Sequence, residues 1–233
     1  MSSPARPVLL LTRPLSDSQR FAAMLPDWDA VISPLQEIRA VDHDSAPLHA
    51  APGLVFTSAH AVPSAGPGRG RLALCVGAHT AQVAREAGFD VREGNGFAEG
   101  LFPLIEAAEV PLIHPHGRHL AKRLPVPGVI VYDQQALPLT DRARALLAGR
   151  APVVLPLFSP RSARLASEAA RGARAALWPV AISHGTLAQW DAPSAGHEVA
   201  DRPEAAAMVA AIRRLALAEQ RCAGRVEKRP GSH

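Results

Sequence analysis

The chain has few lysines, few aromatic residues and few cysteines, and each shortage excludes a class of protein. Lys122 and Lys228 are the two lysines among 25 basic residues, and aromatic residues make up 4% of the chain. Proteins that bind single-stranded nucleic acids need aromatic rings for stacking and a continuous basic groove, whereas here basic residues are scattered among acidic ones. The one basic cluster, residues 221–229, is interpreted as a disordered tail. A nucleic-acid partner is therefore not expected.

The cysteine content and the length of the apolar runs indicate in which cellular compartment the protein is expected. Cys75 lies in an apolar run and Cys222 lies near the tail, without CxxC spacing or a second pair, so a disulfide framework or a zinc knuckle is not expected. The longest apolar run near the start, Val8–Leu11, is far too short to cross a bilayer, and no signal peptide is visible. The sequence predicts two free thiols, no membrane segment and a cytoplasmic location.

The net charge of +4 arises almost wholly from arginine. Arginine in place of lysine can reflect genome composition alone. The guanidinium group also binds carboxylates and phosphates through paired hydrogen bonds, so the same composition suits an acidic ligand. Both interpretations stay open at this point.

Short runs rich in Val, Leu and Ile alternate with helical patterns, which predicts an α/β protein with parallel sheets. At 233 residues, the chain can form two small domains that each bury a core. Several runs are followed at once by Thr or Ser and a helix-compatible stretch, so these hydroxyls are predicted to cap helices. The predicted strands are Val8–Thr12, Leu54–Thr57, Leu72–Val76, Val110–His114, Val129–Tyr132, Val153–Phe158 and Leu177–Ile182.

Two segments of the chain follow one plan. "LVFTSAHAV" is followed by Thr80, 24 residues after Phe56, and "PLFSPRSARLA" is followed by Thr186, 28 residues after Phe158. The paired order and similar spacing indicate an internal duplication.

Two extended segments, residues 33–42 and 128–139, are interpreted as connectors that cross between the two halves. If both cross, residues 37–137 form a domain that is inserted into another domain made of residues 1–36 and 138–233. Tyr132, the single tyrosine of the chain, would then lie at the hinge. A tyrosine on an alternating strand is usually a packing residue whose hydroxyl is hydrogen-bonded.

The motifs, taken in order, resemble those of the uroporphyrinogen-III synthase family. No single motif is specific, and the ordered series carries the resemblance. The matching pieces are "LLLTRP" (9–14), "VFTSAHAV" (55–62), "CVGAHTAQVAREAGFDV" (75–91), "HGRHLAKRL" (116–124), "VYDQQ" (131–135), "FSPRSA" (158–163) and "AISHGTLAQW" (181–190).

The resemblance implies two similar parallel-sheet, flavodoxin-like lobes, one inserted in the other and joined by a two-stranded connector, with the substrate in the cleft. It implies an enzyme that cyclises linear hydroxymethylbilane with loss of water and inversion of ring D through a spiro intermediate. No metal or cofactor is expected. A monomer is expected, with transient contact to the upstream deaminase. The alternative is a non-catalytic, two-lobed cytosolic binder of an acidic ligand.

The resemblance also implies a set of site residues. Tyr132 matches a tyrosine of the family's "VY" segment, and a protonated phenol could donate its proton to the departing hydroxyl. The substrate's eight carboxylates suit backbone N–H groups at helix starts. Each hydroxyl in the set could instead be a plain helix cap. The expected substrate-binding residues are Thr12, Arg13, Thr57, Ser58, Gly77, Thr80, Gly117, Arg118, Ser159, Arg161 and Thr186.

Three features depart from the family or compete with this interpretation. Ser183 stands where the family commonly has glycine, which makes the role of Thr186 less secure. Pro63 lies in the helix expected after "FTSAHAV", so that helix is predicted to be one turn or bent. His114, His116 and His119 could be metal ligands, substrate contacts or parts of a solvated loop, and the metal interpretation is the least favoured because no carboxylate or cysteine accompanies them.

Overall fold

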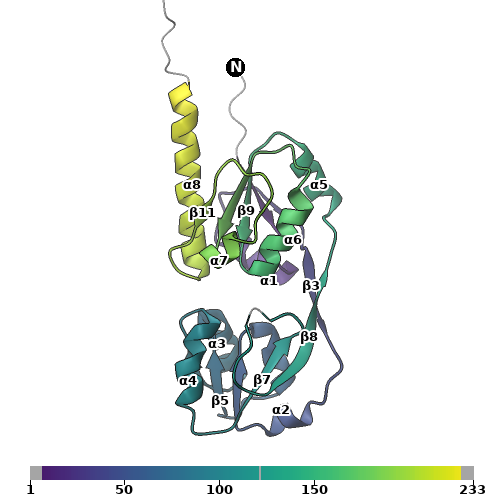
Figure 1. Cartoon of the computed structure of the whole chain (residues 1–233), viewed down its shortest axis with the longest axis vertical. Coiled ribbons are helices and arrows are strands. Elements are labelled where there is room, and N and C mark those ends of the chain that lie inside the picture. Colours follow the sequence, from purple (N-terminus) through teal and green to yellow (C-terminus); the bar gives the residue numbers. More distant parts are fainter. Residues whose placement is uncertain (1–6, 121, 227–233) are drawn as a thin grey trace, which may run out of the picture. The chain divides into compact units, whose positions relative to one another are not determined.

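The computed structural model describes residues 7–120 and 122–226, with side chains described as far as residue 215. The chain forms two compact units (Figure 1): unit 1 comprises residues 1–36 and 136–233, and unit 2 comprises residues 37–135. It enters unit 2 within β3 (Gln36–Ala40) and leaves it at the end of β8 (Gly128–Ala136).

Unit 1 contains a parallel sheet with the strand order β11-β10-β9-β1-β2. Its strands are β1 (Val8–Leu11), β2 (Ala30–Ile32), β9 (Val153–Leu157), β10 (Leu177–Ala181) and β11 (Glu198–Val199). Its helices are α1 (Leu15–Ala23), α5 (Asp141–Ala148), α6 (Pro160–Ala170), α7 (His184–Leu187) and α8 (Ala205–Val226).

Apolar residues fill both faces of the unit 1 sheet. Leu10 and Leu155 pack in one cluster with residues of α5 and α6. Leu9 and Val154 pack in the other with residues of α1 and α8. A strand that is buried on both faces reads as a continuous apolar run, which explains why β1 and β9 are visible in the sequence.

Unit 2 contains a six-stranded sheet with the order β3-β8-β7-β4-β5-β6. Its remaining strands are β4 (Gly53–Phe56), β5 (Leu72–Cys75), β6 (Asp90–Glu93) and β7 (Leu112–Gly117). Its helices are α2 (Ala46–Ala50), the 3-10 helices η1 (Ala59–Ala65) and η2 (Ala98–Leu101), α3 (Ala78–Glu86) and α4 (Phe102–Glu106). Strands β4 to β8 pair in parallel. β3 runs antiparallel to β8, because backbone bonds join Val41 to Val131 and Leu35 to Leu137.

The two sheets share a strand plan. In unit 2, β4 is flanked by β5 and then β6 on one side, and by β7 and then β8 on the other. In unit 1, β9 is flanked by β10 and β11 on one side, and by β1 and β2 on the other. The order along the chain differs, because β1 and β2 precede β9 whereas β7 and β8 follow β4.

The parallel α/β sheets predicted from the sequence are confirmed, and each of the seven predicted runs contains or overlaps a strand. β7 begins two residues after the start of the predicted run 110–114 and continues through His116 and Gly117, which pair with β8. Segment 128–136 is a full strand of the sheet between β3 and β7, rather than a connector alone. Three strands of the structure were not predicted from the sequence: β2, β6 and β11.

Several local predictions can also be compared with the structure. Pro63 lies inside η1, which is a short 3-10 helix, as its sequence indicated. The segment expected to be a disordered tail is helical as far as Val226 in α8, and residues 227–229 lie outside the described part. Cys75 is buried, and burial raises the pKa of its thiol to about 12. The side chain of Cys222 lies outside the described residues.

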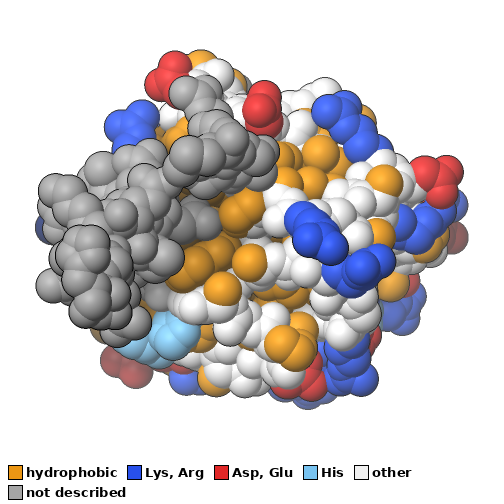
Figure 2. Space-filling model, turned by 90° about the horizontal axis from the view of Figure 1, so that it is seen from above, with side chains coloured by type: hydrophobic (Ala, Val, Ile, Leu, Met, Phe, Trp, Pro, Cys, Tyr) orange, Lys and Arg blue, Asp and Glu red, His pale blue; other side chains and the backbone are white. Residues whose placement is uncertain are grey.

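Two surface properties follow from the described residues. No described helix combines the length and the apolar character that a membrane crossing requires. On the face shown in Figure 2, Lys and Arg side chains occur in separate places, with acidic and uncharged side chains between them. Among the side chains coloured there, basic groups do not form one continuous surface.

Candidate active site

The predicted site residues gather where parallel strands end. Because the strands of each sheet run in the same direction, the residues that follow them meet at one edge. The unit 2 edge is defined by the segments that follow β4, β5, β6 and β7, together with the neighbouring part of β8. It holds Thr57, Ser58, Gly77, Thr80, Gly117, Arg118 and Tyr132. The unit 1 edge follows β1, β2, β9 and β10, and it holds Thr12, Arg13, Ser159, Arg161 and Thr186.

Tyr132 lies in β8 with its side chain in the core of unit 2, where it is 6% exposed. Its hydroxyl is hydrogen-bonded to the side chain of Ser58 and to the backbone of Gly117. Burial raises the pKa of Tyr132, and these two hydrogen bonds offset that effect only in part. The phenol is therefore protonated at neutral pH and can donate a hydrogen bond or a proton.

Gly117, the last residue of β7, and Ser58, the N-cap of η1 after β4, both adjoin the phenol. The pairing of β7 with β8 shifts between His116 and Gly117, which brings Gly117 opposite Tyr132. A Cβ at Gly117 would lie 2.5 Å from Cε2 of Tyr132. Ser58 caps η1 by accepting a hydrogen bond from the N–H of His60, and the His60 ring lies edge-on to Tyr132 at 6.0 Å between centroids.

Thr57 follows β4 directly but does not cap the helix that it precedes, because Ser58 does so. Oγ1 of Thr57 is instead hydrogen-bonded to Nε2 of His114 in β7 at 3.0 Å. His114 is 2% exposed, and burial, with a smaller effect from His116, lowers its pKa to about 4. The imidazole is therefore neutral at neutral pH.

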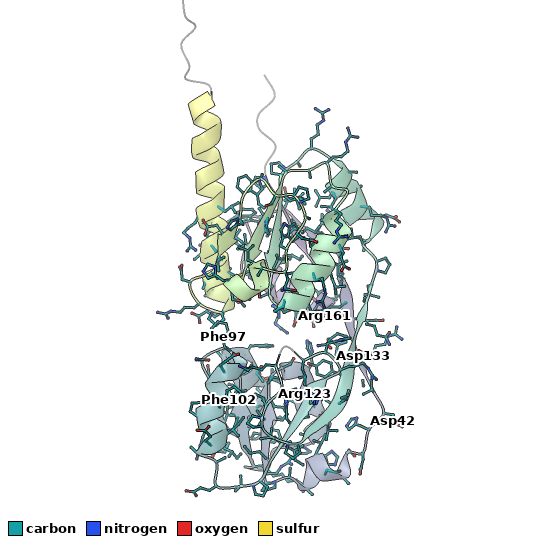
Figure 3. The ribbon with its side chains drawn as sticks, viewed as in Figure 1. Asp42, Phe97, Phe102, Arg123, Asp133 and Arg161 are labelled. Atoms are coloured by element: carbon teal, nitrogen blue, oxygen red, sulfur yellow. The ribbon has the colours of Figure 1, made fainter. Side chains whose placement is uncertain are left out.

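A charged cluster lies beside Tyr132 on the same edge. Nε of Arg118 is 3.3 Å from Oδ2 of Asp133, and Nε2 of His119 is 3.7 Å from Oδ1 of the same carboxylate. Figure 3 shows Asp133 on β8. The Arg118 side chain is about half exposed, so it can contact an anion while it stays paired with Asp133.

The start of α3 offers backbone donors on the unit 2 edge. No side chain caps this helix, and its N-cap is Gly77. The N–H groups in the first turn of a helix have no partner within the helix and attract anions. Thr80 lies in this first turn but is buried, so its side chain is enclosed in the fold rather than open to a ligand.

The loop after β6 also reaches the unit 2 edge. The N–H groups of Gly94 and Gly96 donate to the carbonyls of Cys75 and Val76 at the end of β5. Phe97, labelled in Figure 3, follows this anchored loop and is 41% exposed. The loop therefore presents an apolar ring beside the polar groups of the edge.

On the unit 1 edge, the prediction that Thr12 caps a helix is wrong. Thr12 is buried, and α1 begins after Pro14 without a side-chain cap. Arg13 is paired with Asp17 in the first turn of α1 at 3.0 Å. Its guanidinium also lies 4.2 Å from the centroid of the Phe158 ring. These contacts hold Arg13 at the edge in a fixed position.

Ser159 is the N-cap of α6 and forms a capping box with Ser162, in which each side chain accepts from the backbone of the other. Arg161 lies in the first turn of this helix at the edge of unit 1 (Figure 3). Ser183, noted in the sequence as a departure from the glycine common at this position, caps α7 and is hydrogen-bonded to Oγ1 of Thr186 at 3.1 Å. Thr186 is 1% exposed, so its hydroxyl is used inside the turn.

The three histidines of the "IHPHGRH" segment have separate partners. His114 bonds to Thr57, Nδ1 of His116 bonds to the carbonyl of Gly117 at 2.8 Å, and His119 lies against Asp133. Within residues 7–120 and 122–215, no group of three or more His, Cys, Asp or Glu side chains is arranged to hold a metal ion.

Sequence reasoning missed three contributors to these edges. The loop Gly94–Phe97 was missed because the charged strand before it, β6, shows no apolar pattern, although "GNG" is a turn signal. Ser183 was noted as a departure rather than as a cap. His114 was weighed as a metal ligand, and its bond to Thr57 depends on the pairing of β4 with β7, which no local pattern reveals.

The family of the chain follows from its sequence. A family model described as uroporphyrinogen-III synthase HemD matches residues 26–210. The chain belongs to the uroporphyrinogen-III synthase family. It is therefore an enzyme of tetrapyrrole biosynthesis. No curated protein sequence matches it.

Solved structures of uroporphyrinogen-III synthases have the same fold. The enzyme from Helicobacter pylori is 16% identical with a TM-score of 0.60, and the match covers 90% of this chain and 99% of that one. A substituted form of the enzyme from Thermus thermophilus is 18% identical with a TM-score of 0.51, and the match covers 91% of this chain and 99% of that one. At these identities, the likeness concerns the fold alone.

Proposed function

We propose that the chain converts hydroxymethylbilane into uroporphyrinogen III, and that the unit 2 edge around Tyr132 takes part in this reaction. The terminal hydroxyl of the bilane leaves as water, and the resulting azafulvene is an electrophile. The two ends of the bilane then join through a spiro centre at ring D. This spiro intermediate fragments and recloses with ring D inverted. The overall change is a substitution with loss of water, so no step requires an electron acceptor or donor.

The observation that carries the proposal is the environment of Tyr132 within this family. Loss of the hydroxyl breaks a C–O bond, and the electron pair leaves with oxygen, which must gain a proton to depart as water. Tyr132 carries that proton at neutral pH, because burial raises its pKa. Its ring packs against Gly117, and Ser58 and Gly117 are hydrogen-bond partners of its hydroxyl. A positioned acid of this kind contributes roughly 10²-fold or more to a rate.

The harder task for the enzyme is geometric, because the free bilane closes unaided without inversion. Binding energy from the carboxylates must hold the flexible chain in the curl that favours spiro attack, and such orientation can contribute several kcal/mol, on the order of 7 or more in favourable cases. The uncapped start of α3 and the half-exposed Arg118 support carboxylate binding on the unit 2 edge. On the unit 1 edge, Arg13 and Arg161 are the cationic groups proposed for this role.

The two units are proposed to be related lobes, with unit 2 inserted in unit 1. The shared strand plan of the two sheets supports this relationship. The N-caps also correspond: Ser58 and Ser159 follow the central strands, whereas Gly77 and Ser183 each precede a buried threonine by three residues. We further propose a monomer in the cytoplasm that receives its unstable substrate during transient contact with the deaminase that makes it.

The test supplies porphobilinogen and its deaminase, adds this protein, and then oxidises and separates the uroporphyrin isomers. The type III isomer should dominate with the protein present, and the type I isomer should dominate without it. Heat-denatured protein is the matched control. An isomer ratio equal to that of the control would exclude the enzyme and leave a non-catalytic binder of acidic ligands.

A further inference from the structure

His114 is a buried polar residue that the reaction chemistry does not use. It lies in β7 and is 2% exposed. A buried polar group lowers stability unless it is hydrogen-bonded. An apolar side chain could be buried at this position without any hydrogen-bond partner. The bond between Nε2 of His114 and Oγ1 of Thr57, at 3.0 Å, joins the middle of one strand to the end of the next.

That bond selects one position for a hydroxyl at the unit 2 edge. A threonine side chain has three staggered positions about its Cα–Cβ bond, and a hydrogen bond to a fixed ring favours one of them. The hydroxyl has one hydrogen and two lone pairs, so contact with His114 leaves capacity for a second partner. Thr57 is half-buried rather than enclosed, so a ligand can reach it.

Thr57 stands next to the residue that holds the phenol. Ser58 is hydrogen-bonded to Tyr132, while Thr57 is hydrogen-bonded to His114. The end of β4 is thus tied through adjacent residues to both β7 and β8. A ligand that binds Thr57 is held at a fixed place relative to the Tyr132 hydroxyl.

We infer that His114 is a positioning residue, which orients the Thr57 hydroxyl towards a carboxylate of the bilane without touching the bilane itself. The inference rests on the proposed function. His114 remains neutral at neutral pH because of its burial, so this arrangement persists under working conditions. Its effect is on substrate binding, whereas that of Tyr132 is on the chemical step.

A double-mutant cycle tests the inference with His114→Met, Thr57→Val and the pair combined. KM and kcat for type III isomer formation are measured in the coupled assay. Each single variant should raise KM by about 5- to 10-fold and change kcat by less than about twofold, as expected for lost ground-state binding. The double variant should be no worse than Thr57→Val, because His114 acts only through Thr57.

Two further variants separate positioning from structure. His114→Gln keeps a side-chain amide that can reach Thr57. Its KM should therefore be close to that of the wild type. Leu48→Val weakens the unit 2 core at a fully buried residue, and it should lower thermal stability without changing KM. The inference would be overturned if the effects of the two substitutions on KM multiplied in the double variant. It would also be overturned if His114→Met lowered stability but left KM unchanged. Wild-type protein that forms no type III isomer would instead refute the proposed function, and this inference with it.

Discussion

The ring of Tyr132 occupies the space that a side chain on Gly117 would need. A Cβ at Gly117 would lie 2.5 Å from Cε2 and 2.6 Å from Cζ of that ring, so Gly117→Ala must displace the phenol. Overpacking of this kind typically costs about 1–3 kcal/mol, and small misplacements of a reacting group reduce rates strongly. We expect Gly117→Ala to lower kcat by at least roughly 10-fold, measured as type III isomer formation. Gly172→Ala is the matched control, since nothing lies within 4 Å of that position, and wild-type kcat in Gly117→Ala would contradict the prediction.

Tyr132→Phe removes the hydroxyl but keeps the ring in its place. Because the hydroxyl is proposed to protonate the leaving group, kcat should fall by roughly 10²-fold or more while KM changes little. The lost hydrogen bonds to Ser58 and Gly117 should also lower the free energy of unfolding by about 1 kcal/mol. Single-turnover rates and urea unfolding measure the two effects separately. A rate equal to that of the wild type would restrict Tyr132 to packing.

The central strands of the two sheets were predictable because they are buried on both faces. All four residues of β4 are buried, and a strand of that kind appears in the sequence as an unbroken apolar run. β6 lies at the edge of its sheet and reads Asp-Val-Arg-Glu with little burial, so it has no such run. The caps Ser58 and Ser159 were predictable for a related reason, since a hydroxyl between a strand and a helix is a local signal.

The contacts that define the site could not be predicted in the same way. The bond between Thr57 and His114 joins residues that are 57 positions apart, and it depends on how β4 pairs with β7. Gly117 was expected at the site as a backbone donor. Its role as the space for Tyr132 arises from the shift in strand pairing between His116 and Gly117, which the sequence does not encode as a local motif.

Two substitutions of Ser159 distinguish a residue that only caps a helix from one that also lies beside a bound ligand. Ser159→Ala removes the cap of α6 and should lower the free energy of unfolding by about 1 kcal/mol, with KM unchanged. Ser159→Asp restores a good cap but adds a negative charge at the unit 1 edge, so we expect wild-type stability and a KM raised several-fold. Ala176→Asp is the control. It places the same charge just before β10, at the opposite end of the parallel strands from Ser159. A Ser159→Asp variant with wild-type KM would show that no carboxylate binds there.

Arg71 stabilises unit 2 by donating to many backbone carbonyls at once. Its guanidinium also lies 5.1 Å from the centroid of the Phe89 ring. Lysine cannot reproduce this set, because its three donors leave from a single nitrogen. We expect Arg71→Lys to lower the free energy of unfolding by about 2 kcal/mol or more, measured by urea denaturation. Arg92→Lys, at an exposed arginine of β6, is the control, and equal midpoints for both variants would contradict the prediction. The carbonyls are those of Leu48, His49, Ala51, Ala65, Pro67 and Gly68.

His114 makes the stability of the protein depend on pH in the mildly acidic range. Its pKa is lowered from 6.5 to about 4 by burial, so the unfolded chain binds a proton between these values while the folded chain does not. The free energy of unfolding therefore falls as pH drops from about 6.5 to about 4, by about 3 kcal/mol in total. His114→Gln removes this titration, and its stability should depend less steeply on pH across that window. Urea denaturation at half-unit pH steps measures both slopes, and parallel slopes for the two proteins would show that His114 is protonated in the folded state.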